Sequence, residues 1–291
     1  MKYLSKIIIV ILMLAAMIFA GDQDIYLIIR ADDIGSSHAA NIGCINSFDE
    51  GIAQSVEVMV PCPWFLEAAK LLRELPDYDV GVHLTLTSEW EDYKWGPLTC
   101  APTLTDSNGY FYPRQKDWVH EKAEAFWNAK PDMAEVEAEL RAQIEMAMKH
   151  IPQISHLTGH MGIESESVSP QMTALFHKLA KEYGLDIHPA DYGVKRFNDY
   201  HNPEPQQRNS DREAEFIATL KRLEPGIYLF VEHPGADVPE MQAIGHAGSD
   251  EVAKRRAEVT KIFISKEVQR IIRQRNIKLI SYKDLKSIGE K

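Results

Sequence analysis

The sequence feature that most restricts the fold is an alternation of short apolar runs with amphipathic stretches, which extends over most of the 291 residues. The runs have the length and β-branched composition of buried strands, and the stretches between them have helical spacing. Strands are predicted from residue 25 and at 55–60, 80–86, 154–157, 185–189, 226–231 and 278–280. Helices are predicted at 36–50, 65–74, 131–150, 170–183, 211–223, 250–263 and 266–275. About seven such units predict an α/β protein with a parallel sheet, a single-domain irregular (β/α) barrel of the TIM-barrel type.

The alternation is interrupted by an insertion at residues 88–130, which is rich in aromatic residues, prolines and glycines. A connection of this length inside a compact domain is commonly functional, for example as a lid. Its aromatic side chains either stack on the apolar faces of sugar rings or pack a small core of the insertion itself. They include Trp90, Tyr93, Trp95, Tyr110, Phe111, Tyr112, Trp118 and Trp127.

The N-terminus has the pattern of a secretory signal peptide. Lys2 and Lys6 precede an apolar run at 7–19, which ends at the small residues Ala20 and Gly21. The run is too short for a membrane span, which needs about 20 residues. We therefore expect a signal peptide at 1–20, a barrel domain at 21–291, and export to the periplasm or the exterior without stable membrane insertion after cleavage. The alternative is an uncleaved anchor.

The formal net charge of −11 argues against a nucleic-acid partner, because nucleic-acid-binding proteins need a basic face. The cysteines, Cys44, Cys62 and Cys100, lack the spacing of a metal site and allow at most one disulfide. A two-fold homodimer is compatible with a barrel of this kind, although the sequence identifies no interface for it.

Two adjacent carboxylates, Asp32 and Asp33, follow the first predicted strand and precede Gly35. Ligands bind at the C-terminal ends of the strands in parallel α/β proteins, so both would lie at the mouth of the fold. Consecutive strand residues point to opposite sides, which predicts different roles for the two. The alternative is that Asp33 only caps the following helix, a role that Ser36 or Ser37 would fill equally well.

Three histidines, His83, His160 and His233, also fall at the ends of predicted strands. A lone histidine in a strand is usually a hydrogen-bonded core residue. Their recurrence at equivalent strand ends, however, predicts one shared site. One aspartate and two histidines suit zinc and other divalent ions, and three protein ligands leave positions open for water and substrate.

With these residues in view, the chain resembles the YdjC-like carbohydrate deacetylases, which include the chitooligosaccharide deacetylases. Ala31-Asp32-Asp33-Ile34-Gly35 is similar to the opening motif of the family, Ala-Asp-Asp-Phe-Gly. Gly81-Val82-His83-Leu84 and Glu232-His233-Pro234-Gly235 match two further elements in the family's order. His160 falls where the family has its second metal-binding histidine, and the resemblance spans nearly all of the mature chain.

The resemblance implies a barrel enzyme that removes acetyl groups from N-acetylated sugars with the help of a divalent metal ion, Mg²⁺ or Zn²⁺. It implies that Asp33, His83 and His160 hold the metal and that Asp32 is the general base. His233 would protonate the leaving amine or contact the substrate. The resemblance also allows the reverse assignment, with Asp33 as the general base and Asp32 as the metal ligand.

The sequence departs from the family around the second histidine. The family commonly has Asp-Ser-His-x-His there, whereas this chain has Thr158-Gly159-His160-Met161-Gly162. The metal-binding histidine is retained, but the neighbouring aspartate and second histidine are not. The departure leaves open a different sugar substrate or a different level of activity.

Two other classes of function fit the same barrel. A glycoside hydrolase needs two carboxyl groups that flank a sugar bond, and Asp32 would then need a partner such as Glu89 or Glu232. A non-catalytic carbohydrate-binding protein is the other, supported by the altered residues at Thr158 and Gly162.

Overall fold

The computed structural model describes residues 24–116, 124–167, 169–196, 211–245 and 251–289. The predicted signal peptide and Trp118 lie outside these ranges. Within them, no helix combines the length and the apolar character needed to cross a membrane.

A parallel sheet of seven strands is built around β1, a long and entirely buried strand. Its N-terminal half pairs with β7 and its C-terminal half with β2, while β6 pairs with it from residue 25 to residue 31. The order along the sheet is β4-β3-β2-β1-β6-β5. The strands are β1 Ile25–Ile34, β2 Ser55–Val58, β3 Asp79–Leu84, β4 Ile154–Gly159, β5 Lys195–Arg196, β6 Gly226–Glu232 and β7 Ile277–Ile280.

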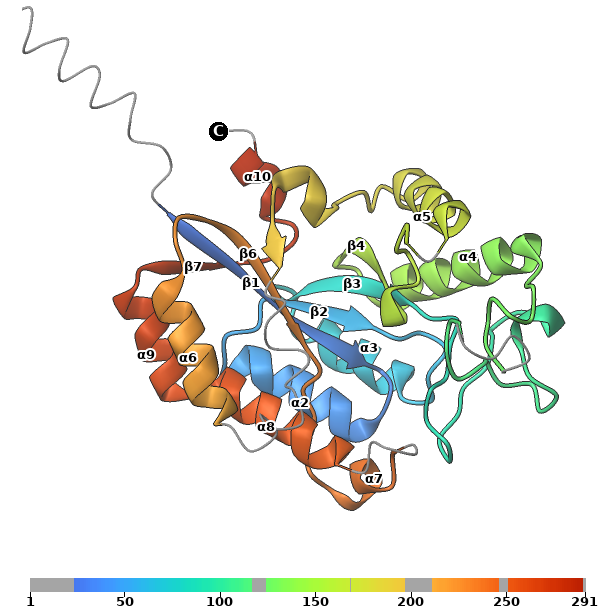
Figure 1. Cartoon of the computed structure of the whole chain (residues 1–291), viewed down its shortest axis with the longest axis horizontal. Helices are drawn as coiled ribbons and strands as arrows, with labels where there is room; N and C mark the ends of the chain where they lie inside the picture. Colours follow the sequence, from blue (N-terminus) through green and yellow to red (C-terminus); the bar gives the residue numbers. More distant parts are fainter. Residues whose placement is uncertain (1–23, 117–123, 168, 197–210, 246–250, 290–291) are drawn as a thin grey trace, which may run out of the picture.

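The sheet is an open half-barrel, so the expected irregular (β/α) barrel is not closed as a TIM barrel is: β4 and β5 end the sheet and do not pair with each other in the described residues (Figure 1). The strand predicted at 185–189 is absent. Leu185 and Ile187 are buried, as their alternation suggested, but they make no strand ladder. Pro189 has no backbone N–H to donate and begins a 3-10 turn, Pro189–Tyr192. The short β5 pairs instead, in a stretch where no strand was predicted.

Helices α2, α3, α6, α8 and α9 lie on one side of the sheet and α10 on the other (Figure 1). Several begin at a capping side chain, such as Ser37 at α2 and Asp132 at α4. The helices are α2 His38–Asp49, α3 Phe65–Arg73, α4 Met133–His150, α5 Pro170–Glu182, α6 Arg212–Arg222, α7 Pro239–Gln242, α8 Val252–Ile264, α9 Lys266–Gln274 and α10 Leu285–Gly289. Further 3-10 turns lie at Pro102–Leu104 and His160–Gly162.

The two faces of the sheet differ in composition. Alternate residues of the strands pack into the main apolar core under the helices; we call this the outer face. It includes Leu27, Ile29, Val56, Val80, Val82 and Leu157. The inner, concave face carries buried polar side chains on β1 to β4, namely Arg30, Asp32, Ser55, Glu57, Asp79, His83, His156 and Thr158. A smaller apolar cluster that includes Tyr26, Ile28 and Ile280 packs on this face beside the N-terminal half of β1.

Most of the aromatic residues that the structure describes in the insertion belong to the main core or pack against it. Trp95, Phe111 and Phe126 are at most 3% exposed and are part of it. The indole N–H of Trp95 donates to the backbone oxygen of Thr87, 2.8 Å away. Tyr110, by contrast, is 43% exposed. Core packing therefore accounts for Trp95, Phe111 and Phe126.

Candidate metal centre and active site

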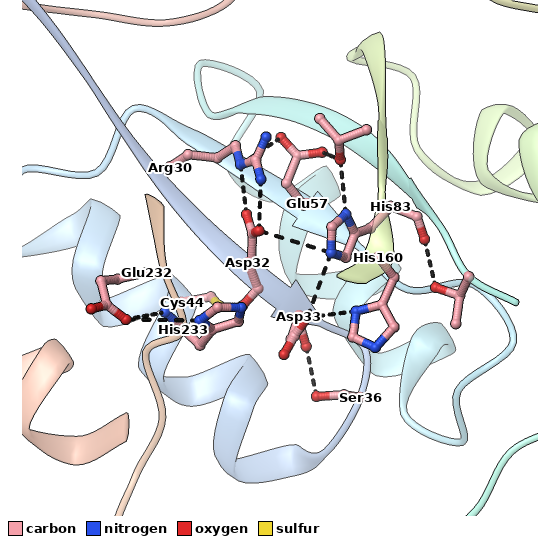
Figure 2. A network of polar contacts seen from close by, with 12 residues as sticks. Arg30, Asp32, Asp33, Ser36, Cys44, Glu57, His83, His160, Glu232 and His233 are labelled. Atoms are coloured by element: carbon pink, nitrogen blue, oxygen red, sulfur yellow. Dashed lines mark hydrogen bonds and ion pairs between the residues drawn. The ribbon is translucent and has the colours of Figure 1, made fainter. Parts of the chain in front are cut away.

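Asp33, His83 and His160 meet at the C-terminal end of the sheet. One ligand atom from each lies within 4.8 Å of the other two, and all three residues are buried. Asp33 Oδ1 is 3.7 Å from His83 Nε2 and 3.5 Å from His160 Nδ1 (Figure 2). We refer to these residues as the triad. The structure thus brings together the three residues that the sequence singled out as metal ligands.

The two adjacent aspartates both face His83, which corrects the expectation that strand alternation would separate them. Asp32 Oδ2 lies 3.8 Å from His83 Nε2, about as far as Asp33 Oδ1. The register between β1 and β2 shifts between Ala31 and Ile34, and Asp33 has a φ of 75°. This irregularity returns the second carboxylate to the inner face. A left-handed backbone at a residue other than glycine is uncommon and is concentrated at functional sites.

Asp33 does not cap the following helix, because Ser37 performs that role. Its Oδ2 instead accepts a hydrogen bond from Arg256 Nη2 on α8, 2.6 Å away. Burial raises the pKa of Asp33, but the positive charges of Arg256 and the neighbouring histidines outweigh it and hold the pKa well below its usual range. Oδ1 is buried and has no hydrogen-bond partner among the residues that the structure describes. An ionised oxygen in this state is well suited to bind a cation.

His83 presents its Nε2 to the centre of the triad. Its Nδ1 lies 2.8 Å from the hydroxyl of Thr158. Burial lowers the pKa of His83 to about 4, although the carboxylates around it act in the opposite direction. The ring is therefore neutral at neutral pH, the state in which histidine binds metals.

His160 lies between two carboxylates. Its Nδ1 faces Asp33, and its Nε2 is 3.1 Å from Glu89 Oε2, which the insertion supplies. Burial lowers the pKa of His160, but Glu89 and Asp33 outweigh this and raise it to about 10. Surroundings that hold a proton on His160 also favour a divalent cation, which would replace that proton.

The triad fits a divalent metal ion on three observations: the mixed oxygen and nitrogen donors, the orphan Oδ1 of Asp33, and outer partners for both imidazoles. Metal-binding histidines usually place their second ring nitrogen against a carboxylate, backbone carbonyl or water. His160 does so directly on Glu89, and His83 does so on the Thr158 hydroxyl.

Asp32 is held by Arg30, a residue that the sequence reasoning did not identify. Arg30 Nε donates to Oδ1 at 2.7 Å and its Nη2 to Oδ2 at 2.8 Å (Figure 2). Its Nη1 donates to the Tyr282 hydroxyl at 2.9 Å. A signal was available: a charged residue inside the apolar run of β1 needs a buried partner. The same signal applies to Glu57 in β2.

His233 lies at the end of β6, as predicted, but outside the triad. Its side chain is 40% exposed, and its Nδ1 is 3.7 Å from Glu232 Oε2. Burial lowers the pKa of His233. The charge of Asp33 and the hydrogen bond with Glu232 raise it by a larger amount, so the net shift is upward. Glu232 itself accepts a hydrogen bond from Arg212 at 2.8 Å.

Comparison with known proteins gives consistent matches. The model of a family described as YdjC-like protein matches residues 26–274. Carbohydrate deacetylase 1 of Listeria innocua is 31% identical over 267 residues, which cover 89% of this chain and 99% of that protein. A carbohydrate deacetylase of Thermus thermophilus is 32% identical over 236 residues, which cover 75% of this chain and 80% of that protein. The crystal structure of a proposed cellobiose-phosphate cleavage protein from Enterococcus faecalis V583 shares the fold, with a TM-score of 0.70, 24% identity, and coverage of 90% of this chain and 99% of that one.

Proposed function

The chain belongs to the YdjC-like protein family, and on that premise we propose that it is a metal-dependent hydrolase that removes acetyl groups from N-acetylated sugars or oligosaccharides. The observation that carries the proposal is the meeting of Asp33, His83 and His160 beside Asp32. The names of the relatives, carbohydrate deacetylases, support the class of substrate and reaction.

In this proposal Asp33, His83 and His160 hold the metal ion. Two imidazoles and one carboxylate suit Zn²⁺ and similar first-row ions better than Mg²⁺, which prefers oxygen ligands. When bound, the ion supplies Lewis-acid polarisation of the acetyl carbonyl and lowers the pKa of water. Arg256 occupies Oδ2 of Asp33, so Oδ1 is the oxygen that would hold the ion.

Asp32 is the general base in this mechanism. It accepts the proton of the attacking water, and Arg30 fixes the orientation of its carboxylate through two hydrogen bonds. Each carboxylate oxygen keeps a further lone pair beyond the one that Arg30 uses. Asp33 is the less suitable base, because its Oδ1 faces both triad histidines as a metal ligand and its pKa is well below the usual range.

His233 is the candidate acid for the leaving amine. An acid must carry a proton at the working pH, and the neighbouring Asp33 and Glu232 raise the pKa of His233 despite the effect of burial. Its side chain is partly exposed at the end of β6, where a substrate has access.

The structure gives less support to the two other classes of function. The carboxylates that a glycoside hydrolase would need beside Asp32 are engaged elsewhere, Glu89 with His160 and Glu232 with Arg212. The altered Thr158, which motivated a binding protein without turnover, keeps contact with a triad histidine.

The test is acetate release from a panel of N-acetylated oligosaccharides, with and without a chelator and with Zn²⁺ or Mg²⁺ added back. We expect acetate only when metal is present. Reducing ends without acetate would instead establish a glycoside hydrolase. Sugar binding without either product would establish a binding protein.

Export is part of the proposal and rests on the N-terminal sequence alone. We expect the protein recovered from the periplasm or medium of an expressing cell to begin at Gly21. Intact-mass measurement tests this, and a chain that retains residues 1–20 would contradict cleavage.

A further inference from the structure

Glu57 on β2 is a fully buried carboxylate that is not a member of the triad. It accepts a hydrogen bond from the Thr158 hydroxyl, and its Oε1 is 2.8 Å from His156 Nε2. Both of these partners are on β4. Because β3 lies between β2 and β4, the Glu57 side chain crosses a whole strand to reach them.

Gly81 makes this crossing possible. It is paired with Glu57 on one side and with His156 on the other, so it lies directly between them. A Cβ at residue 81 would lie 2.2 Å from Glu57 Oε2 and 2.5 Å from His156 Nε2, closer than any real contact. The missing side chain therefore leaves the passage through which the carboxylate reaches β4.

The hydrogen bonds from Glu57 through Thr158 to His83 determine which ring nitrogen of His83 keeps an unshared lone pair. Glu57, whose Oε1 is also 3.9 Å from Arg30 Nε, is an ionised carboxylate and can only accept. The single hydroxyl hydrogen of Thr158 therefore goes to Glu57. Thr158 Oγ1 must then accept from His83 Nδ1, which leaves the lone pair of His83 on Nε2, the atom that faces Asp33.

We propose that Glu57 is a positioning residue that fixes the ring and tautomer of the metal ligand His83 through Thr158, across the gap at Gly81. This inference deepens the proposed function and rests on its metal site.

The first test compares two variants of residue 158. Thr158→Val removes the hydroxyl at nearly constant shape, and Thr158→Ser keeps the hydroxyl but loses the methyl group. Loss of an outer partner of a metal ligand typically weakens metal binding about 10- to 100-fold. We expect that loss of Zn²⁺ affinity, measured by competition with a chelator, in Thr158→Val and less than about threefold in Thr158→Ser.

A third variant controls for general damage to the buried polar face. Ser155→Ala removes a hydroxyl that donates to Asp79 at 2.6 Å and contacts His156, without touching His83. We expect its Zn²⁺ affinity to match the wild type. Equal affinities in Thr158→Val and Thr158→Ser would overturn the proposal, and so would a loss in Ser155→Ala as large as that in Thr158→Val.

A measurement on the wild type keeps the proposal testable even where the valine variant does not fold. In protein labelled with ¹⁵N-histidine, we expect the His83 ring to carry its hydrogen on Nδ1, both before and after Zn²⁺ is added. A hydrogen on Nε2 in the metal-free protein would overturn the proposed relay, by which we mean the hydrogen bonds from Glu57 through Thr158 to His83.

These readouts separate the relay from the proposed reaction. If no sugar releases acetate but Thr158→Val still loses Zn²⁺ affinity, the reaction fails and the relay stands. If acetate is released and the two residue-158 variants bind Zn²⁺ equally, the relay fails and the reaction stands.

Discussion

The outer and inner faces of the same sheet are built on opposite principles. On β3, Val80, Val82 and Leu84 point outward into the apolar core, while Asp79 and His83 point inward among hydrogen-bonded polar groups. Both sets are buried, so burial alone does not distinguish them. The outer residues need only the right volume, whereas each inner residue needs a particular partner.

This difference teaches that stability and chemistry are assigned to alternate residues of the same strands. Apolar burial on the outer face contributes most of the free energy of folding. The inner face gains little net stability from its charges, because their desolvation offsets their attraction. Substitutions on the two faces should therefore have separable effects.

The largest effect is expected from His83→Ala. Removing a triad ligand should lower acetate release about a thousandfold or more, equivalent to about 4 kcal/mol of transition-state stabilisation. The measurement is kcat/KM on the best sugar of the panel, with bound metal quantified in parallel.

The matched control is the neighbouring Val82→Ala, which should destabilise the fold by about 1 to 3 kcal/mol in urea unfolding and leave kcat of the folded protein unchanged. If Val82→Ala lowered kcat as strongly as His83→Ala, the separation of the two faces would be wrong.

Arg256→Met tests where the separation of the two faces fails. The Arg256 side chain comes from helix α8, in the layer that covers the outer face, and yet it reaches the triad. The substitution leaves the buried carboxylate of Asp33 without its cation, which should cost about 3 kcal/mol of unfolding free energy in metal-free protein. A bound divalent ion compensates the same charge, so the loss should shrink in Zn²⁺. A loss that is identical with and without Zn²⁺ would show that Arg256 acts only through packing.

Arg30→Lys should have a smaller effect. Lysine keeps the charge but cannot donate in parallel to both oxygens of Asp32, so the carboxylate loses its fixed orientation. We expect kcat to fall roughly 10- to 100-fold with little change in KM. An unchanged kcat together with an unchanged pH profile would remove Asp32 from the role of general base.

The smallest effect is expected from Trp95→Phe. The substitution keeps an aromatic ring in the core but loses the hydrogen bond to Thr87, which should cost about 1 kcal/mol of stability. KM for the sugar should stay within about twofold, because the ring is packed against protein. A several-fold rise in KM would show that Trp95 stacks on the substrate.

The order of most strands and helices was predictable because it follows from local patterns, and so was the approach of Asp33, His83 and His160 to one another. The same pattern also placed His233 in the shared site, whereas the family resemblance singled out the three residues of the triad. The apolar runs of β1, β2, β3, β4, β6 and β7 mark their strands, and strand ends in a parallel sheet share one edge. The run at 185–189 shows the limit of this reasoning. The alternation of apolar residues in this run correctly indicates which side chains are buried. Whether an extended segment pairs with a strand, however, depends on partners elsewhere in the chain.

Two of the contacts that tune the site were not predictable from spacing. Glu57 reaches across β3 and Arg256 comes from a distant helix, and no regular interval in the sequence connects either of them with the triad. Arg30 differs, because it lies two residues before Asp32 on β1 and therefore on the same face of the sheet. The direction predicted for the Asp33 side chain was also wrong, because a bulge overrides the alternation of an ideal strand. A charged residue within an apolar run signals that a partner exists without identifying it.

The left-handed backbone at Asp33 has a consequence for which sequences can occupy this site. Position 33 must combine a short carboxylate with a φ of 75°; asparagine tolerates that φ but lacks the charge, and β-branched residues are strained there. Gly35, with a φ of 96°, is restricted as well, because a Cβ there would lie 2.9 Å from the Met59 backbone oxygen. Random mutation at these two codons should therefore yield almost no active substitutes, and a library selected for activity would return Asp33 and Gly35 nearly unchanged.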